Sequence, residues 1–118
     1  MKKTMLCLSL VLLGFGLSSA NAEEFLADRH AKLGLPCTSC HVKDGSPELK
    51  LDDKKHEACV GCHGWYDEVA KKTVPKDPAN VNPHSQHDGN LPCTECHKGH
   101  KPGHNYCGEC HMYNYKVP

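Results

Sequence analysis

Residues 92–111 of this chain read PCTECHKGHKPGHNYCGECH, with four cysteines and four histidines in twenty positions. The cysteines form two C-x-x-C pairs, and a histidine directly follows each pair. The same five-residue motif, C-x-x-C-H, therefore occurs twice within one short stretch.

The motif also occurs twice upstream, so eight of the nine cysteines belong to it. The pairs are Cys37 with Cys40, Cys59 with Cys62, Cys93 with Cys96, and Cys107 with Cys110, and the histidines that follow them are His41, His63, His97 and His111. About one residue in ten is histidine, so four such successions have chance odds of about one in ten thousand. C-x-x-C-H is the attachment site of a c-type haem, whose vinyl groups take the two thiols while the adjacent imidazole ligates the iron. The sequence predicts four covalently bound haem c groups.

Other uses of paired cysteines explain the pattern less well. Four disulfides would not need a histidine after each second cysteine. Zinc ribbons are chiefly intracellular, and four cysteines per metal would leave the histidines unexplained. A thioredoxin-like redox pair is usually a single copy in a strand–helix context, which is absent here.

The first 22 residues have the features of a secretory signal peptide. Two lysines precede an apolar run from Met5 to Leu17, which is too short to span a membrane. Ala20 and Ala22 supply the small residues of a cleavage site. We expect a cleaved leader at residues 1–22 and an exported, periplasmic tetrahaem domain at residues 23–118.

The composition of residues 23–118 excludes some functions and limits the fold. The chain has fourteen basic and fourteen acidic residues, and removing Lys2 and Lys3 leaves twelve against fourteen, a net charge of −2. This balance gives no basic footprint for nucleic acid. Few branched aliphatic residues are present, so we expect the haems to form the core. The expected fold is a small, mainly α and irregular multihaem cytochrome, with short helices and loops wrapped around four haems and little or no β structure.

The second axial ligand of each haem decides between electron transfer and substrate binding. Six histidines lie outside the motifs: His30, His56, His84, His87, His100 and His104. The one methionine after the leader, Met112, directly follows His111 and cannot reach the opposite face of that haem. We therefore expect bis-histidine ligation at all four irons, low potentials, and no iron left to bind oxygen or nitrite.

Histidine spacing limits which haem each spare imidazole can reach. If His97 ligates its own haem, His100 lies too close in the chain to reach the far side of that haem. It must serve another haem or none. His84 and His87 have the same spacing and offer one imidazole to each of two haems.

From Leu26 to His111 the chain resembles the small periplasmic tetrahaem cytochromes c and the similar haem domain of the flavocytochrome c fumarate reductases. The stretches that carry the resemblance are HAKLG at 30–34 leading to CTSCH at 37–41, HSQHDGNL at 84–91 before Cys93, and HKGH at 97–100.

The resemblance implies a distal ligand for each haem. His100 would serve the first haem, His30 the second, His84 the third and His87 the fourth. His56 and His104 have no counterpart in the family, and we expect them to be the two histidines that do not ligate iron.

These features predict an electron carrier rather than an enzyme, or the cytochrome subunit of a reductase. The resemblance implies electron transfer in anaerobic respiration, from a membrane quinol dehydrogenase to a flavin-containing, fumarate-reductase-like partner. No G-x-G-x-x-G fingerprint occurs in the sequence, so we expect the flavoprotein to be encoded separately. The alternatives are a multihaem enzyme that reduces a small nitrogen or sulfur oxide at one open haem, and a protein for haem storage.

The segment from His63 to His84 is longer than the family pattern. Residues 65–72, WYDEVAKK, favour two turns of helix, and the prolines of residues 74–83 favour an extended loop. Docking of a partner and a solvated loop are both open interpretations. Trp65 is expected to pack on a haem face, and the lysine pairs at 54–55 and 71–72 are candidates for steering a partner.

Overall fold

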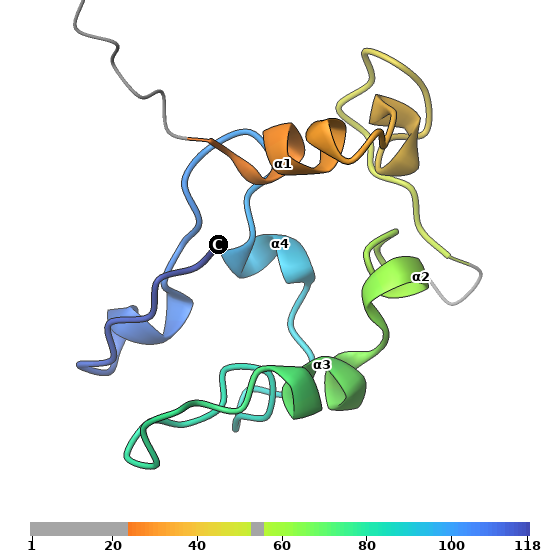
Figure 1. The fold of residues 1–118 in the computed structure, drawn as a ribbon. Coiled ribbons are helices and arrows are strands. Elements are labelled where there is room, and N and C mark those ends of the chain that lie inside the picture. Colours follow the sequence, from red (N-terminus) through yellow and green to blue (C-terminus); the bar gives the residue numbers. More distant parts are fainter. Residues whose placement is uncertain (1–23, 53–55) are drawn as a thin grey trace, which may run out of the picture.

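A computed structural model describes residues 24–52 and 56–118. The predicted leader and the lysine pair at 54–55 lie outside these residues. The elements are α1 (Leu26–Lys32), η1 (Cys37–Ser39), α2 (Val60–His63), α3 (Tyr66–Lys72), α4 (Cys93–Cys96) and η2 (Tyr106–Glu109), where η marks a 3₁₀ helix. Figure 1 shows them spread around the molecule and joined by long loops rather than packed as a bundle.

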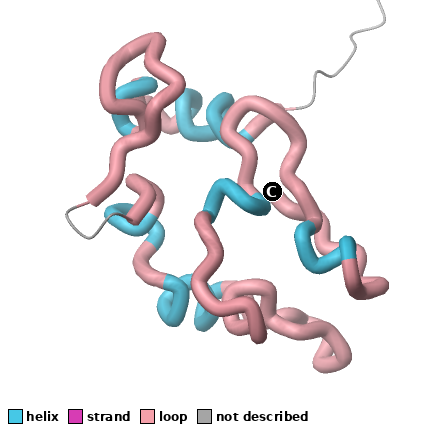
Figure 2. The backbone as a smooth tube through the Cα atoms, turned by 180° about the vertical axis from the view of Figure 1, so that it is seen from behind, coloured by secondary structure: helices cyan, strands magenta, loops and turns pink. Residues whose placement is uncertain are grey.

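No strand occurs in the described part of the chain, where loops predominate (Figure 2). Two isolated antiparallel bridges, His41 with Leu49 and Leu51 with Glu57, are the closest approach to a sheet there. The expectation of short helices with little or no β structure is confirmed for these residues. Their wrapping around four haems stays a prediction.

The two seven-residue helices start with the same device. At α1 the Asp28 carboxylate accepts a hydrogen bond from the Phe25 backbone N–H at 2.9 Å, and at α3 Glu68 accepts from Trp65 at 3.0 Å. A carboxylate three residues into the helix satisfies a backbone donor that has no partner within the helix. The predicted helix at 65–72 is confirmed, with Trp65 as its cap.

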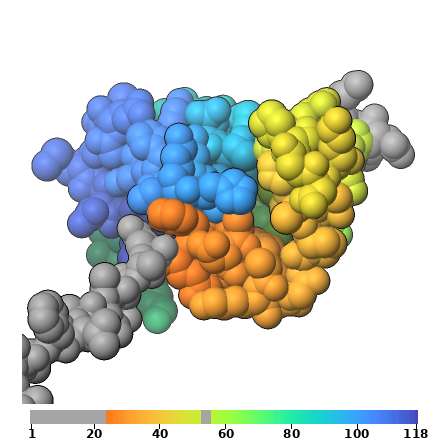
Figure 3. All heavy atoms as spheres, turned by 90° about the horizontal axis from the view of Figure 1, so that it is seen from above, coloured from red at the N-terminus to blue at the C-terminus, as the bar shows by residue number. Residues whose placement is uncertain are grey.

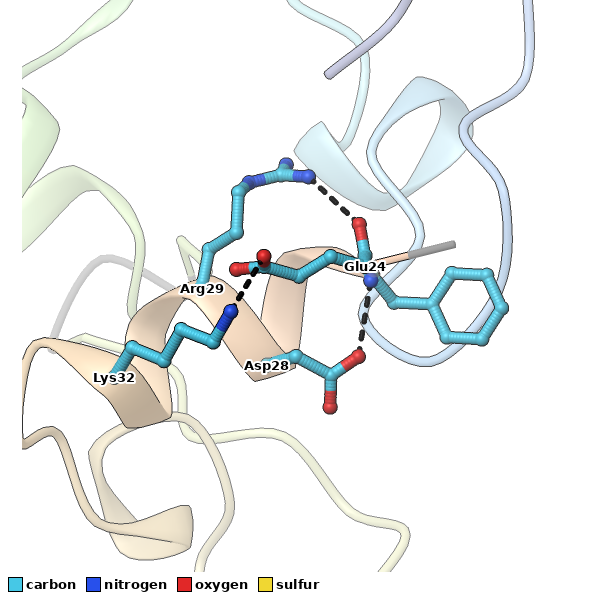
Figure 4. Close-up of polar contacts among 5 residues, drawn as sticks. Glu24, Asp28, Arg29 and Lys32 are labelled. Atoms are coloured by element: carbon cyan, nitrogen blue, oxygen red, sulfur yellow. Dashed lines mark hydrogen bonds and ion pairs between the residues drawn. The ribbon is translucent and has the colours of Figure 1, made fainter. Parts of the chain in front are cut away.

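Helix α1 is bounded by a change of backbone conformation at each end. Phe25 has an extended backbone, and Gly34 follows the last turn with φ = 84°. Two further contacts link α1 to the residue before Phe25. Lys32 Nζ lies 2.7 Å from Glu24 Oε2, and Arg29 donates to the Glu24 carbonyl at 3.1 Å (Figure 4). Both contacts are exposed, so each contributes little to stability.

The described residues form no hydrophobic core of their own. None of their side chains is buried, and several apolar ones, Leu33 and Val74 among them, are largely exposed. A chain without an apolar core needs a metal, a cofactor or disulfides to offset its ordering entropy. The cysteines of the four motifs form no disulfides, so the structure fits the expectation that haem supplies the core.

Hydrogen bonds between distant segments connect the loops. The Ala27 N–H donates to the Gly99 carbonyl at 2.8 Å, where α1 and the residues near position 100 lie together (Figure 3). The Tyr66 hydroxyl donates to the Leu91 carbonyl at 2.5 Å, and burial raises the pKa of Tyr66 to about 12, so this donor stays protonated. The chain ends beside α4 (Figure 1).

Gly64 connects α2 to α3 in a conformation that other residues avoid. Its dihedral angles are φ = 87° and ψ = 177°, and a Cβ at this position would collide with the Glu68 side chain. That carboxylate caps α3, so it is not free to move away. Glycine is therefore required where the second motif passes into α3.

We predict that Gly64→Ala destabilises the protein by roughly 1–3 kcal/mol, the cost of backbone strain in this region. Denaturant unfolding followed by far-ultraviolet circular dichroism measures the change. Gly99→Ala is the matched control, because Gly99 has an ordinary backbone and open space around its Cβ. Equal stability of the two variants would contradict the assignment.

Candidate haem-binding sites

The four C-x-x-C-H motifs share one local geometry. Each overlaps a short helical element, η1, α2, α4 or η2. In each, the backbone N–H of the histidine donates to the carbonyl of the first cysteine: 3.0 Å for His41, 2.9 Å for His63, 2.9 Å for His97 and 2.9 Å for His111. A bond between residues four apart closes one helical turn and brings positions one and five to the same side. One turn of chain thus presents a thiol and an imidazole together.

The eight cysteines predicted to attach haem differ in their surroundings. All of them are free thiols in the described residues, four are exposed and four are half-buried. The exposed ones are Cys37, Cys40, Cys62 and Cys110, and the half-buried ones are Cys59, Cys93, Cys96 and Cys107. The half-buried set contains both cysteines of the third motif, which is therefore the most enclosed of the four.

The second cysteine of each motif does not always lie within the helical element. Cys110 lies directly after η2 and Cys40 directly after η1, whereas Cys62 and Cys96 lie within α2 and α4. The Cys110 N–H still donates to the Cys107 carbonyl at 3.3 Å, so the turn that carries this pair is intact. The structure leaves the Cys110 thiol exposed and not bonded to another cysteine. Attachment of haem at Cys110, as at the other seven cysteines, stays a prediction.

Each motif histidine lies beside one histidine from another part of the chain. The distances between ring centroids are 6.0 Å for His41–His100, 6.0 Å for His30–His63, 6.1 Å for His84–His97 and 6.0 Å for His87–His111. The family resemblance implied these same four pairs. Their role as ligands stays a prediction.

The spacing fits two imidazoles on opposite sides of one iron. A metal–nitrogen bond is about 2 Å long, and the ring centroid lies about 1 Å further out, so two axial imidazoles should have centroids about 6 Å apart. Ring–ring packing alone would not give the same centroid distance in four separate pairs. The donor set, two thiols and two imidazoles at each site, also matches haem c.

The four pairs differ in the angle between their ring planes. The planes are close to parallel in His84–His97 at 9° and in His41–His100 at 22°. They are close to perpendicular in His30–His63 at 79° and in His87–His111 at 69°. The sites therefore form two geometric classes.

Hydrogen bonds at Nδ1 leave Nε2 available for a metal. His30 Nδ1 lies 2.8 Å from the Leu26 carbonyl, and His97 Nδ1 lies 3.3 Å from the Pro118 carbonyl. A carbonyl only accepts, so Nδ1 holds the proton in both rings and Nε2 keeps its lone pair. His41 Nδ1 is buried and has no partner in the described residues.

The environment of His84 favours the neutral ring. Burial lowers the pKa of His84, and the neighbouring His97 lowers it further. The Nδ1 atom lies 2.9 Å from the Thr73 hydroxyl oxygen. A neutral imidazole is the form that ligates a metal.

His56 and His104 lie beside other partners. His104 Nε2 lies 2.8 Å from Glu109 Oε1. This contact uses the ring nitrogen that His30 and His97 keep available for a metal. The ring of His56 packs on Trp65 with centroids 3.9 Å apart, and its Nδ1 lies 3.3 Å from Asp52. The expectation that these two are not ligands stays a prediction.

Glu57 is a site residue that the sequence did not reveal. Its carboxylate accepts hydrogen bonds from the Cys93 backbone N–H at 2.6 Å and the Thr94 hydroxyl at 2.5 Å. Burial acts to raise the pKa of Glu57, but the bonds from Thr94 and Cys93 outweigh it and lower this pKa. A charged carboxylate thus links the second motif, which begins at Cys59, to the third.

Glu57, Cys59 and Cys93 also place one oxygen and two sulfur atoms within 4.8 Å of one another, close enough to hold a metal ion. Both cysteines open a C-x-x-C-H motif, and thioether bonds to haem would leave neither sulfur as a thiolate. We therefore interpret the cluster as a close approach of two haem-attachment sites. No pattern in the sequence predicts it, because Glu57 and Cys93 lie 36 positions apart.

Comparison with known proteins identifies the family. Residues 29–112 match the family model described as Cytochrome c3. The probable fumarate reductase Ifc3 of Shewanella frigidimarina is 36% identical over 98% of this chain and 18% of its own length. The cytochrome c-type protein Cgr1 of Eggerthella lenta is 27% identical over 82% of this chain and 56% of its own.

A solved structure shows the same fold. It is described as the open conformation of a flavocytochrome c3 fumarate reductase, with a TM-score of 0.55 and 35% identity over 80% of this chain and 15% of that one. The chain thus spans only part of the length of each of these three proteins. In the part that the structure describes, no helix has the length and apolar character needed to cross a bilayer.

The matched region contains all four C-x-x-C-H motifs and both members of every imidazole pair. Members of this family bind haem c covalently and carry electrons. The chain belongs to the cytochrome c3 family and is a multihaem electron carrier of that type, related to the haem domain of the fumarate reductases.

Proposed function

We propose that this chain is a periplasmic tetrahaem cytochrome c that carries electrons from a membrane quinol dehydrogenase to a separately encoded flavoprotein reductase in anaerobic respiration. One observation carries most of the proposal. Four pairs of imidazoles have centroids 6.0–6.1 Å apart, and each pair joins one motif histidine to one histidine from elsewhere.

In this proposal the chain holds four haem c groups through the eight motif cysteines and the eight paired histidines. Haem c, when bound, supplies reversible one-electron transfer at its iron. The paired imidazoles would hold the iron from both sides, and the absence of a usable methionine favours low potentials. The rival function, reduction of a small oxide at an open iron, needs a motif histidine without a partner, and each of the four has one.

The acceptor is inferred from the relatives. Ifc3 is named a probable fumarate reductase, and the similar solved structure is a flavocytochrome c3 fumarate reductase. This sequence has no dinucleotide fingerprint of its own. A flavin-containing partner that reduces fumarate or a similar unsaturated acid therefore fits best. The signal-like residues 1–22 support export, and a quinol dehydrogenase is the donor class suited to a periplasmic carrier.

We predict that the purified holoprotein has the mass of the polypeptide plus four haems. Carbon monoxide should not shift the spectrum of the reduced protein, because both axial positions of every iron are occupied. Intact-mass spectrometry and visible absorption measure the two properties. Fewer than four haems, or a carbon monoxide shift equivalent to one haem in four, would refute bis-histidine ligation at all four sites.

Exchange of one proposed ligand should raise one potential. His30→Met should raise the midpoint potential of one haem in four, within the roughly 0.8 V range that axial ligands control. Spectroelectrochemical titration resolves the change. His104→Met is the matched control, since its Nε2 lies against Glu109, and it should leave all four potentials unchanged. The ligand assignment is wrong if the two variants titrate alike.

Electron delivery to fumarate should require a second protein. We predict that the reduced cytochrome alone is not reoxidised by fumarate, nitrite or sulfite. Addition of a catalytic amount of a purified periplasmic FAD-containing fumarate reductase should start reoxidation by fumarate. Stopped-flow absorption follows the reaction. Rapid oxidation by nitrite or sulfite without a partner would favour the enzyme alternative instead.

A further inference from the structure

Residues 64–83 contain α3 and the proline-rich loop, and they supply none of the haem ligands proposed above. The structure shows where both ends of this loop lie. Thr73, directly after α3, and Asn82, two residues before His84, both bond to His84. The segment therefore holds the histidine that pairs with His97 in the third motif.

The directions of these hydrogen bonds can be assigned from chemistry. The Thr73 hydroxyl lies 2.8 Å from the Val69 carbonyl, which can only accept, and 3.4 Å from Asn82 Oδ1, which also only accepts. Two oxygens 2.8 Å apart repel unless a hydrogen lies between them, so the single hydroxyl hydrogen points to Val69 and not to His84. His84 Nδ1 must then donate to Thr73 Oγ1, which leaves Nε2 unprotonated.

Asn82 holds the backbone of His84 against the same turn. Its Oδ1 accepts from the His84 N–H at 2.9 Å, and its Nδ2 donates to the Ala70 carbonyl at 2.8 Å. Ala70 and Val69 belong to the last turn of α3, where carbonyls lack a full set of partners within the helix. The end of α3 thus positions both the ring and the backbone of His84.

Tyr66 supports the ring from the other end of α3. Its ring centroid lies 6.1 Å from that of His84 at an angle of 57°, and its hydroxyl bonds to the Leu91 carbonyl. The His84 ring lies within 9° of parallel to His97. His87 is different, because its Nδ1 lies 3.2 Å from the carboxylate of the next residue, Asp88, and its side chain is 75% exposed.

We infer that Thr73 is a positioning residue for the third haem site: its hydroxyl fixes the tautomer and plane of His84 and makes this imidazole a stronger electron donor to iron. The inference rests on the proposed ligation by His84 and assigns a role to the segment that departs from the family pattern. Acceptors of the Nδ1–H bond orient metal-ligating histidines and raise their basicity. The two ends of the loop then have a role in the third haem site, whether or not the exposed residues between them also contact a partner.

The plane of an axial imidazole can be measured directly. In low-spin ferric haems, near-parallel imidazole planes give well-resolved rhombic EPR signals, and near-perpendicular planes give a broad, strongly anisotropic low-field signal. The wild-type holoprotein should therefore show both classes, with two haems in each. Potentials report ligand basicity separately, because a weaker donor stabilises ferric iron less.

The test is Thr73→Val, which keeps the shape of the side chain and removes the hydroxyl. We expect one rhombic EPR signal to change and one of four midpoint potentials to shift upward. Thr73→Ser keeps the hydroxyl and should restore both wild-type properties. Val74→Thr, the reverse exchange at the next residue, whose side chain is 68% exposed, is the matched control and should change neither. Thr73→Ala also removes the hydroxyl, and its smaller side chain fits even if valine does not, so it should have the same effects as Thr73→Val.

Two failures can be told apart. If the wild type shows four bis-histidine haems but Thr73→Val and Thr73→Ala keep its EPR signals and potentials, the role of Thr73 is refuted and the proposed function stands. The same holds if Thr73→Ser is shifted as much as Thr73→Val. If the wild type lacks four low-spin bis-histidine signals, the proposed function itself fails.

Discussion

Under the proposed ligation, the fold depends on the pairing of imidazoles that lie far apart in the sequence. Ordinary core packing is not available, because none of the side chains in residues 24–52 and 56–118 is buried. His41 and His100 are 59 positions apart, yet their rings lie 6.0 Å from one another. Under the proposed ligation, an iron bonded to both rings joins the first motif to the segment after the third. Metal ligation then supplies folding free energy that apolar burial supplies in other domains.

Polar contacts set how the motifs approach one another. Glu57 is the clearest case, since it precedes the second motif and accepts two short bonds from the first two residues of the third. Hydrogen bonds to a charged carboxylate are about twice as strong as neutral ones. In a domain with little apolar packing, such a contact helps to fix the relative position of the second and third motifs.

Local features were readable from the sequence, and features made by tertiary contact were not. The C-x-x-C-H motifs and the helix at 65–72 each depend on residues within one or two turns, so their patterns are visible in the chain. The start of α1 is set by the bond from the Phe25 N–H to Asp28, and no apolar periodicity marks that residue. The structure packs Trp65 on His56, a contact that the sequence did not indicate, and the expected packing of Trp65 on a haem face stays a prediction. Glu57 and Thr73 carry no sequence signal, since their partners lie 36 and 11 positions away.

A repeated motif raises the problem of how four similar sites become different. Under the proposed ligation, every iron has two histidine ligands. The type of ligand therefore cannot make the four midpoint potentials differ. The partners of the distal rings do differ: a backbone carbonyl at His30, a hydroxyl at His84 and a carboxylate at His87. A more negative acceptor makes an imidazole more basic and stabilises ferric iron. These partners lie outside the C-x-x-C-H motifs. Residues between the motifs can therefore make the haem potentials differ, and a difference in potential gives electron flow a direction.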